Sequence, residues 1–197
     1  MSLPPPETLH TSSQLTQTNI LNSLFEPCPT LTSYLIPKLF NNISKPYKSY
    51  NELIEKSHDL LTELRQDPTT PKSTIESIVS AHPRLGPQKP SSTTTTTTTT
   101  TITELSDHSS SEQAQLKGTP EQAEQLLKLN ELYELTFPGL RFVVFVNGRS
   151  RESIMIDMKD RINRNDYKLE IKEAFDAMCD IALDRANKLG VKLEGKL

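Results

Sequence analysis

The chain contains no tryptophan and few aromatic residues, which make up 6% of its 197 residues, and its hydrophobic fraction is only 34%. This length suffices for one sizeable domain and is short for two. The formal net charge of -3 gives no broad basic surface of the kind that nucleic-acid binding requires. No apolar run approaches the roughly 20 residues that cross a bilayer. We therefore expect one domain without nucleic-acid or membrane partners.

Cysteine is also scarce. Cys28 and Cys179 are too few for a disulfide framework and do not show metal-ligand spacing. Residues 1–13 are polar and rich in proline, serine and threonine, unlike a secretory signal. We expect a soluble intracellular protein with reduced thiols. The final Gly195-Lys196-Leu197 differs from the peroxisomal address Ser-Lys-Leu only at its first residue, so peroxisomal and cytoplasmic locations both stay open.

Apolar residues recur at helical spacing along most of the chain. This pattern predicts an all-α, single-domain helical bundle of about seven or eight helices with one short extended segment. Residues 1–13 are expected to form a disordered leader, residues 14–190 the helical domain, and residues 191–197 a tail. The expected helices span residues 14–25, 29–40, 49–64, 72–81, 119–135, 150–161 and 166–190.

Low-complexity sequence interrupts the helical pattern at residues 87–108. Prolines and serines lead into the consecutive threonines Thr93–Thr101, which have no periodicity with which to bury a face. We expect a flexible surface insert. A glycosylated stalk is the alternative, but no secretory signal supports it.

His82 is the first candidate for chemistry. It precedes Pro83, which disfavours the helical region for the residue before it, so the helix over 72–81 is expected to end there. The fixed φ of proline would also hold the direction of the imidazole. Two interpretations stay open: a solvent-exposed histidine stabilised by the helix dipole, or an acid–base group. The other histidines have no partner at metal-ligand spacing, so no metal site is expected.

Two further segments carry polar or ligand-facing candidates. Ser109 with Glu112 forms a capping-box pattern, which starts a helix and can also present N–H groups and hydroxyls to an anionic ligand. The run Phe142, Val143, Val144, Phe145 and Val146 predicts a buried extended segment, and a plain core segment is the alternative to a ligand-facing one. The run also matches part of an RNA-recognition motif, but helical flanks and an acidic chain argue against RNA binding.

Arg185 lies on the apolar stripe of the last expected helix, and guanidinium groups are almost never buried without a partner. An ion pair, with Glu131 as one candidate partner, would explain its position. The alternative is that the Arg185 guanidinium binds a ligand carboxylate through two hydrogen bonds. The residues that define the stripe are Ala174, Met178, Ile181 and Leu189.

The order of these motifs resembles the 2-oxo-4-hydroxy-4-carboxy-5-ureidoimidazoline (OHCU) decarboxylase family over about residues 14–190, outside the threonine insert. That family has a His-Pro pair, Ser-x-x-Glu-Gln, a Leu-Asn-x-x-Tyr helix, a Phe-Val-rich segment, and an arginine followed closely by asparagine. The matching residues here are His82-Pro83, Ser109 with Glu112-Gln113, Leu129-Asn130 with Tyr133, Phe142–Val146, and Arg161 with Asn163 and Asn165. The chain departs from many members after His-Pro, where Arg84-Leu85-Gly86 is one residue shorter than Asp-Leu-Ala-Gly.

The resemblance implies a lyase of urate breakdown that forms (S)-allantoin from a ureidoimidazoline carboxylate without a cofactor, with a homodimer as a candidate assembly. It implies His82 as the acid–base residue and Glu112 as its carboxylate partner. It further implies a substrate cradle and Arg161 as a supporting residue. The cradle residues are Pro83, Ser109, Gln113, Phe142, Val143, Val144, Phe145, Val146 and Arg185. A catalytically inactive helical interaction module, marked by an exposed apolar patch, is the alternative function.

Overall fold

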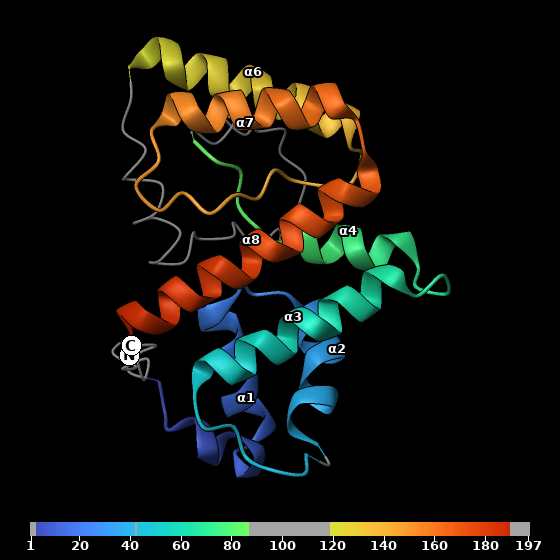
Figure 1. The fold of residues 1–197 in the computed structure, drawn as a ribbon, viewed down its shortest axis with the longest axis vertical. Helices are drawn as coiled ribbons and strands as arrows, with labels where there is room; N and C mark the ends of the chain where they lie inside the picture. The colour runs from blue at the N-terminus through green and yellow to red at the C-terminus, as the bar shows by residue number, and fades with distance from the viewer. Residues whose placement is uncertain (1–2, 42, 87–118, 190–197) are drawn as a thin grey trace, which may run out of the picture. The chain divides into compact units, whose positions relative to one another are not determined.

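The structure, a computed structural model, describes residues 3–41, 43–86 and 119–189 (Figure 1). This part of the chain contains helices and no strands, so the all-α prediction is confirmed. In chain order the elements are the 3-10 helix η1 (Pro6–Thr11), α1 (Gln14–Leu24), α2 (Pro29–Phe40), α3 (Tyr50–Gln66), α4 (Lys72–Ser80), α6 (Pro120–Thr136), α7 (Arg151–Arg164) and α8 (Tyr167–Lys188).

The chain divides into two compact units. Unit 1 comprises Met1–His82, Val143–Phe145 and Asp166–Leu197, and unit 2 comprises Pro83–Phe142 and Val146–Asn165. The helices η1, α1, α2, α3, α4 and α8 belong to unit 1, whereas α6 and α7 belong to unit 2. One boundary between the units passes directly between His82 and Pro83.

Side-chain caps start the helices where the sequence predicts them. The Oγ1 of Thr119 accepts a hydrogen bond from Gln122 N at 3.3 Å, while Thr119 N donates to Gln122 Oε1 at 3.2 Å, so the predicted capping box is present. Ser150 caps α7 through Ser153 N at 3.1 Å. Asp166 caps α8 by accepting a hydrogen bond from Leu169 N. These side chains satisfy backbone N–H groups that have no partner within the helix.

The C-terminal ends of α2 and α7 test two predicted helix boundaries, of which the first is confirmed and the second is three residues short. Pro37 lies inside α2, which nevertheless continues to Phe40 because the proline is on the exposed side, where water can solvate the carbonyl group it leaves without a partner. The helix predicted to end near Arg161 continues to Arg164. It stops at Asn165, whose φ of 50° is left-handed, a conformation that asparagine tolerates better than most residues.

The predicted disordered leader is wrong for residues 3–13. Leu9 is fully buried, and its carbonyl oxygen accepts a hydrogen bond from Gln17 Nε2 at 2.9 Å. The buried Tyr50 hydroxyl donates to the Pro4 carbonyl at 2.9 Å. Burial of one leucine and these two hydrogen bonds tie this segment to unit 1. A single apolar residue in a polar stretch has no periodicity, so the sequence pattern could not reveal the contact.

The core of unit 1 centres on α3 and α8, which lie against each other over much of their length (Figure 1). Their apolar faces supply fully buried side chains, and α1, α2 and α4 close the rest of the core. The largest apolar contributors from α3 and α8 include Tyr50, Leu53, Leu61, Phe175 and Met178. Within the described ranges, no helix is long and apolar enough to cross a membrane.

Candidate active site

His82 lies just after α4, which ends at Ser80 with Ala81 as its C-cap. The backbone N–H of His82 donates to the Val79 carbonyl at 3.3 Å, so the chain makes a last tight turn before the proline. The predicted helix end is therefore confirmed to within a residue. The side chain is only 5% exposed, which corrects the expectation of a solvent-exposed histidine. A buried imidazole is better shielded from water than a surface one, as acid–base chemistry on a desolvated substrate requires.

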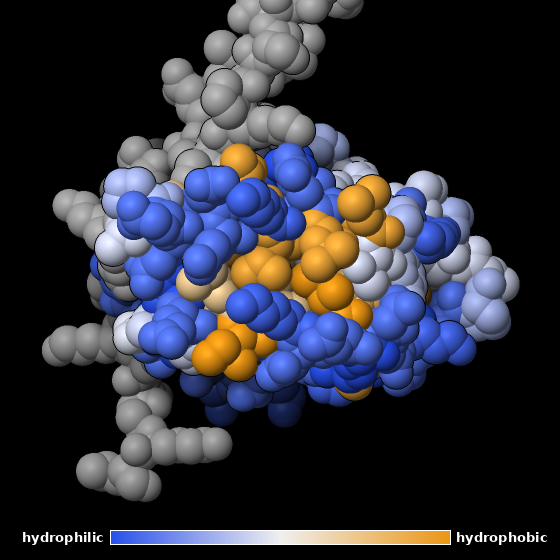
Figure 2. Space-filling view, turned by 90° about the horizontal axis from the view of Figure 1, so that it is seen from above, coloured by the Kyte–Doolittle hydropathy of each residue, from blue (hydrophilic) through white to orange (hydrophobic). Residues whose placement is uncertain are grey.

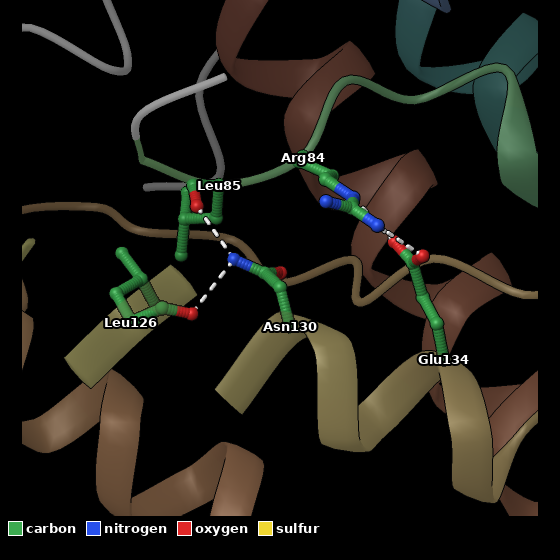
Figure 3. A network of polar contacts seen from close by, with 5 residues as sticks. All are labelled: Arg84, Leu85, Leu126, Asn130 and Glu134. Carbon is green, nitrogen blue, oxygen red and sulfur yellow. Dashed lines mark hydrogen bonds and ion pairs between the residues drawn. The ribbon is translucent and has the colours of Figure 1, made fainter. Parts of the chain in front are cut away.

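The segment that follows His82 is fastened to α6 within unit 2 (Figure 3). The Arg84 guanidinium donates from Nε to Glu134 Oε1 at 2.6 Å and from Nη2 to Glu134 Oε2, a two-pronged ion pair. Such paired, charge-assisted hydrogen bonds fix the orientation of both groups as well as their separation. The hydrogen bonds to the Glu134 carboxylate raise the pKa of Arg84 above its already high range, so the guanidinium stays charged at any physiological pH.

Asn130 makes a second attachment of the same segment. Its Nδ2 donates to the Leu85 carbonyl at 2.9 Å and to the Leu126 carbonyl, one turn earlier on α6, at 3.0 Å (Figure 3). The side chain is 2% exposed. The asparagine of the Leu-Asn-x-x-Tyr motif therefore has a physical role in this chain: it joins the segment after His-Pro to α6.

Gly86 completes the attachment. Its φ of 88° is in the left-handed region, and a Cβ atom placed there would come within 2.6 Å of Leu126 Cδ2. Only glycine allows the backbone both this conformation and this close approach to α6. Arg84, Leu85 and Gly86 thus each contact α6 in a different way, by an ion pair, a backbone hydrogen bond and close packing.

The apolar run 142–146 is buried as predicted, apart from the half-buried Phe145, and it has no partner strand within the described residues. In unit 2, the Phe142 ring packs edge-on against Tyr133, with ring centroids 5.4 Å apart. The Arg161 guanidinium lies over the same ring, 4.9 Å from its centroid. Phe142 and Arg161, predicted separately as site residues, are therefore brought together.

A tight turn closes the other end of this run. Asn147 and Gly148 both have positive φ, 38° and 74°, and Arg149 N donates to the Val146 carbonyl at 2.8 Å. Asp157 on α7 then accepts hydrogen bonds from Arg149 Nη2 at 3.0 Å and Arg161 Nε at 3.1 Å. One carboxylate thus links the turn after the run to the arginine beside Phe142.

Arg185 has a protein partner in unit 1. The side chain is 1% exposed, its Nη2 lies 2.7 Å from Glu26 Oε1, and its Nη1 donates to the Phe25 carbonyl at 3.3 Å. The expected ion pair to a neighbouring element is present, and Glu26 is a partner in it. Glu26 lies between α1 and α2 and carries no local pattern that would have identified it.

The remaining predicted residues divide into two sets. Pro83 is half-buried at the start of unit 2, and Val143, Val144 and Phe145 belong to unit 1. The threonine insert, the Gly195-Lys196-Leu197 ending and the residues Ser109, Glu112 and Gln113 lie outside the described residues. In the part of the chain that the structure describes, no group of three or more His, Cys, Asp or Glu side chains is placed to hold a metal ion.

An open cavity of about 530 Å³ between α3 and α8 has no signature in the sequence. His58 Nε2 lies 2.8 Å from Asp176 Oδ1, and Lys172 Nζ lies 2.6 Å from Asp176 Oδ2. Burial, with the carboxylates of Asp176 and Asp180, raises the pKa of Cys179 to about 12, so this thiol is not a nucleophile at neutral pH. The cavity lining comprises Ile54, Glu55, His58, Asp59, Asp176, Cys179, Asp180 and Leu183.

Comparison with known proteins gives one family and one fold. The family model described as OHCU decarboxylase matches residues 10–187. A solved structure described as (S)-allantoin synthase is similar, with a TM-score of 0.59 and 13% sequence identity. The match covers 94% of this chain and 54% of that one, so this chain spans about half the length of that protein. At this identity the likeness supports the fold alone. No curated protein sequence matches the chain.

Proposed function

Because this chain belongs to the OHCU decarboxylase family, we propose that it removes CO₂ from 2-oxo-4-hydroxy-4-carboxy-5-ureidoimidazoline to give (S)-allantoin. The observation that carries the proposal is the family match across residues 10–187, together with the buried His82 at the end of α4. The product named for the similar solved structure, (S)-allantoin, agrees with it. Such a protein would be a carboxy-lyase of urate breakdown.

The proposed reaction requires few catalytic groups, because the substrate itself can stabilise the charge left when CO₂ departs. The carboxylate leaves from a carbon flanked by heteroatoms and a carbonyl group, and the electron pair left behind can spread into that carbonyl. We therefore propose that the reaction needs no cofactor as an electron sink. The protein must hold the carboxylate, exclude water, and deliver a proton to one face of the carbon, because the stereochemistry of allantoin is set at that step.

His82 is the proposed acid–base residue. Imidazole has an ordinary pKa near 6.5, which suits proton transfer at neutral pH. Glu112 is its proposed carboxylate partner. Pro83, Ser109, Gln113 and the backbone of residues 142–146 form the proposed substrate cradle. The burial of residues 142, 143, 144 and 146 supports this assignment, since a desolvated wall strengthens every polar interaction made with the substrate.

The two arginines carry different weight in this proposal. Arg161 is a supporting residue, because its guanidinium lies over Phe142 at one end of the cradle segment. Arg185 already binds Glu26 and the Phe25 carbonyl, and a substrate carboxylate would have to share the guanidinium with them. The ion-pair interpretation is the simpler one for Arg185. A carboxylate-binding role remains a proposal that the variants in the Discussion test.

The direct test adds purified protein to freshly generated OHCU and follows circular dichroism as chiral product forms. The parent protein should accelerate decay and yield optically active allantoin. His82→Asn should lose at least about 100-fold in turnover, the range that general acid–base catalysis supplies. His58→Asn is the matched control and should keep the parent rate, because His58 pairs with Asp176 on the cavity between α3 and α8. Decay no faster than without protein would refute the proposed function.

An exposed apolar patch favours the interaction module as the second candidate function. Leu132 and Leu135 on α6 and Ile156 on α7 are 48%, 77% and 51% exposed. Figure 2 shows apolar side chains gathered on this face of unit 2. Patches of this kind mark contact surfaces, and a homodimer that covers it is compatible with either function. Leu135→Glu should convert such a dimer to monomer in light scattering. An unchanged mass would remove this face from the assembly.

A further inference from the structure

The segment Arg84–Gly86 departs from the family pattern, and each of its three residues contacts α6 in unit 2. We propose that Arg84, Glu134 and Asn130 are positioning residues that fix the backbone leaving His82. This inference rests on the proposed function for its catalytic consequence, but its structural basis is independent of it.

The geometry of the Arg84–Glu134 pair suits such a role. Both guanidinium hydrogen bonds run to the two oxygens of one carboxylate, and the side chains are 19% and 29% exposed. A planar guanidinium bound at two points cannot rotate without breaking a bond, unlike the point charge of a lysine. The pair therefore fixes the orientation of the Arg84 guanidinium on Glu134 and limits how far the Arg84 backbone can move from α6.

Asn130 holds Leu85, the residue after Arg84, by a hydrogen bond to its carbonyl group. Its Nδ2 is shared between the Leu85 and Leu126 carbonyls, so the segment carbonyl and the helix carbonyl are held by one amide. The side chain is almost fully buried, so water does not replace these bonds easily. Arg84 and Leu85 are both held on α6, and Pro83, whose φ is fixed by its ring, is the one residue between them and His82.

The short segment after His-Pro is compatible with this arrangement. With three residues from Arg84 to Gly86, the chain reaches α6 at Glu134, Asn130 and Leu126, which are spaced by one helical turn each. The residues of the segment thus contact successive turns of one helix face. Arginine at position 84 supplies the ion pair that anchors the segment directly after the proline.

The experiment compares Glu134→Gln with the matched control Glu124→Gln on the same helix. In the described part of the chain, Glu124 pairs with the exposed Lys128 at 2.7 Å, with side-chain exposures of 66% and 71%. We expect Glu134→Gln to lower kcat about 10- to 100-fold, as displacement of a catalytic group by about 1 Å does, while KM changes little. Glu124→Gln should leave both parameters at parent values.

Two further variants separate positioning from general destabilisation. Arg84→Lys keeps the charge but loses the fork, so kcat should fall although the protein stays folded. The exchanged pair Arg84→Glu with Glu134→Arg restores two opposite charges and should recover part of the lost kcat. Amide hydrogen exchange of residues 84–86 should accelerate at least about tenfold in Glu134→Gln and Arg84→Lys, with α3 and α8 unchanged.

The outcomes distinguish the two proposals. Parent kcat in both Glu134→Gln and Arg84→Lys would overturn the positioning role, and so would unchanged exchange at residues 84–86. If the parent protein itself does not convert OHCU, the proposed function fails, whereas the exchange measurement still decides whether the segment is held by α6. If Glu134→Gln does not fold, Arg84→Lys and the exchanged pair provide the same comparison.

Discussion

Removal of the Arg185 guanidinium should lower the unfolding free energy of unit 1 strongly, even though Arg185 is a charged residue on an otherwise apolar stripe of α8. Arg185→Met keeps an unbranched side chain of similar shape but leaves the Glu26 carboxylate buried, at 5% exposure, without the cation 2.7 Å away. Breaking a buried ion pair by removing one partner costs about 3–5 kcal/mol of unfolding free energy. The Phe25 carbonyl also loses its hydrogen bond from Nη1, which is part of that cost.

The double variant Glu26→Leu with Arg185→Met provides the critical comparison. It removes both charges together, and replacement of a buried pair by apolar side chains is often neutral or stabilising. We expect it to recover at least about 2 kcal/mol of the loss in Arg185→Met. Urea unfolding monitored by circular dichroism measures all three proteins. Lys188→Met, which breaks the half-exposed pair with Asp184 on the same helix, is the control and should change stability by less than about 1 kcal/mol.

Two results would refute this reasoning. Parent-like stability of Arg185→Met would show that Glu26 does not need its partner, and a double variant no more stable than the single one would show that charge is not the cause. The same double variant tests the carboxylate-binding role. A folded protein with parent KM removes Arg185 from the substrate site, and a raised KM places it there.

Two further predictions concern Gly86 and Cys179. Gly86→Ala should lower the unfolding free energy, measured in urea, by about 2–4 kcal/mol, because a left-handed φ and a Cβ 2.6 Å from Leu126 Cδ2 act together. The control Gly148→Ala, with a φ of 74° and nothing within 4 Å of the added Cβ, should lower it by about 1 kcal/mol. Equal losses would show that the close approach to α6 is unimportant. Cys179 should resist iodoacetamide at about pH 8 in the folded protein and react in urea, because its pKa is raised to about 12 and its side chain is only 6% exposed. Mass spectrometry of the peptide that contains Cys179 measures the labelling. Labelling of the folded protein at the rate of free glutathione would contradict the burial of this thiol.

The sequence alone determined the helical elements and most of their first residues. The predicted caps of three helices are present, at Thr119, Ser150 and Asp166. A cap is a contact between residues three positions apart, so the local sequence is enough to predict it. The buried stripe that contains Arg185 also followed from helical periodicity. The same periodicity could not reveal the packing of residues 3–13, whose Leu9 and Pro4 carbonyls accept hydrogen bonds from Gln17 on α1 and from Tyr50 on α3.

The tertiary structure decided which polar residues meet. Arg185 is 159 positions from Glu26, and Arg84 is 50 positions from Glu134, so no local pattern connects the partners. The burial of His82 likewise depends on elements packed around the end of α4 rather than on its proline neighbour. Local interactions fix where each helix begins and ends, whereas a buried charge or amide must find its partner wherever folding places one, because leaving it unpaired costs several kcal/mol.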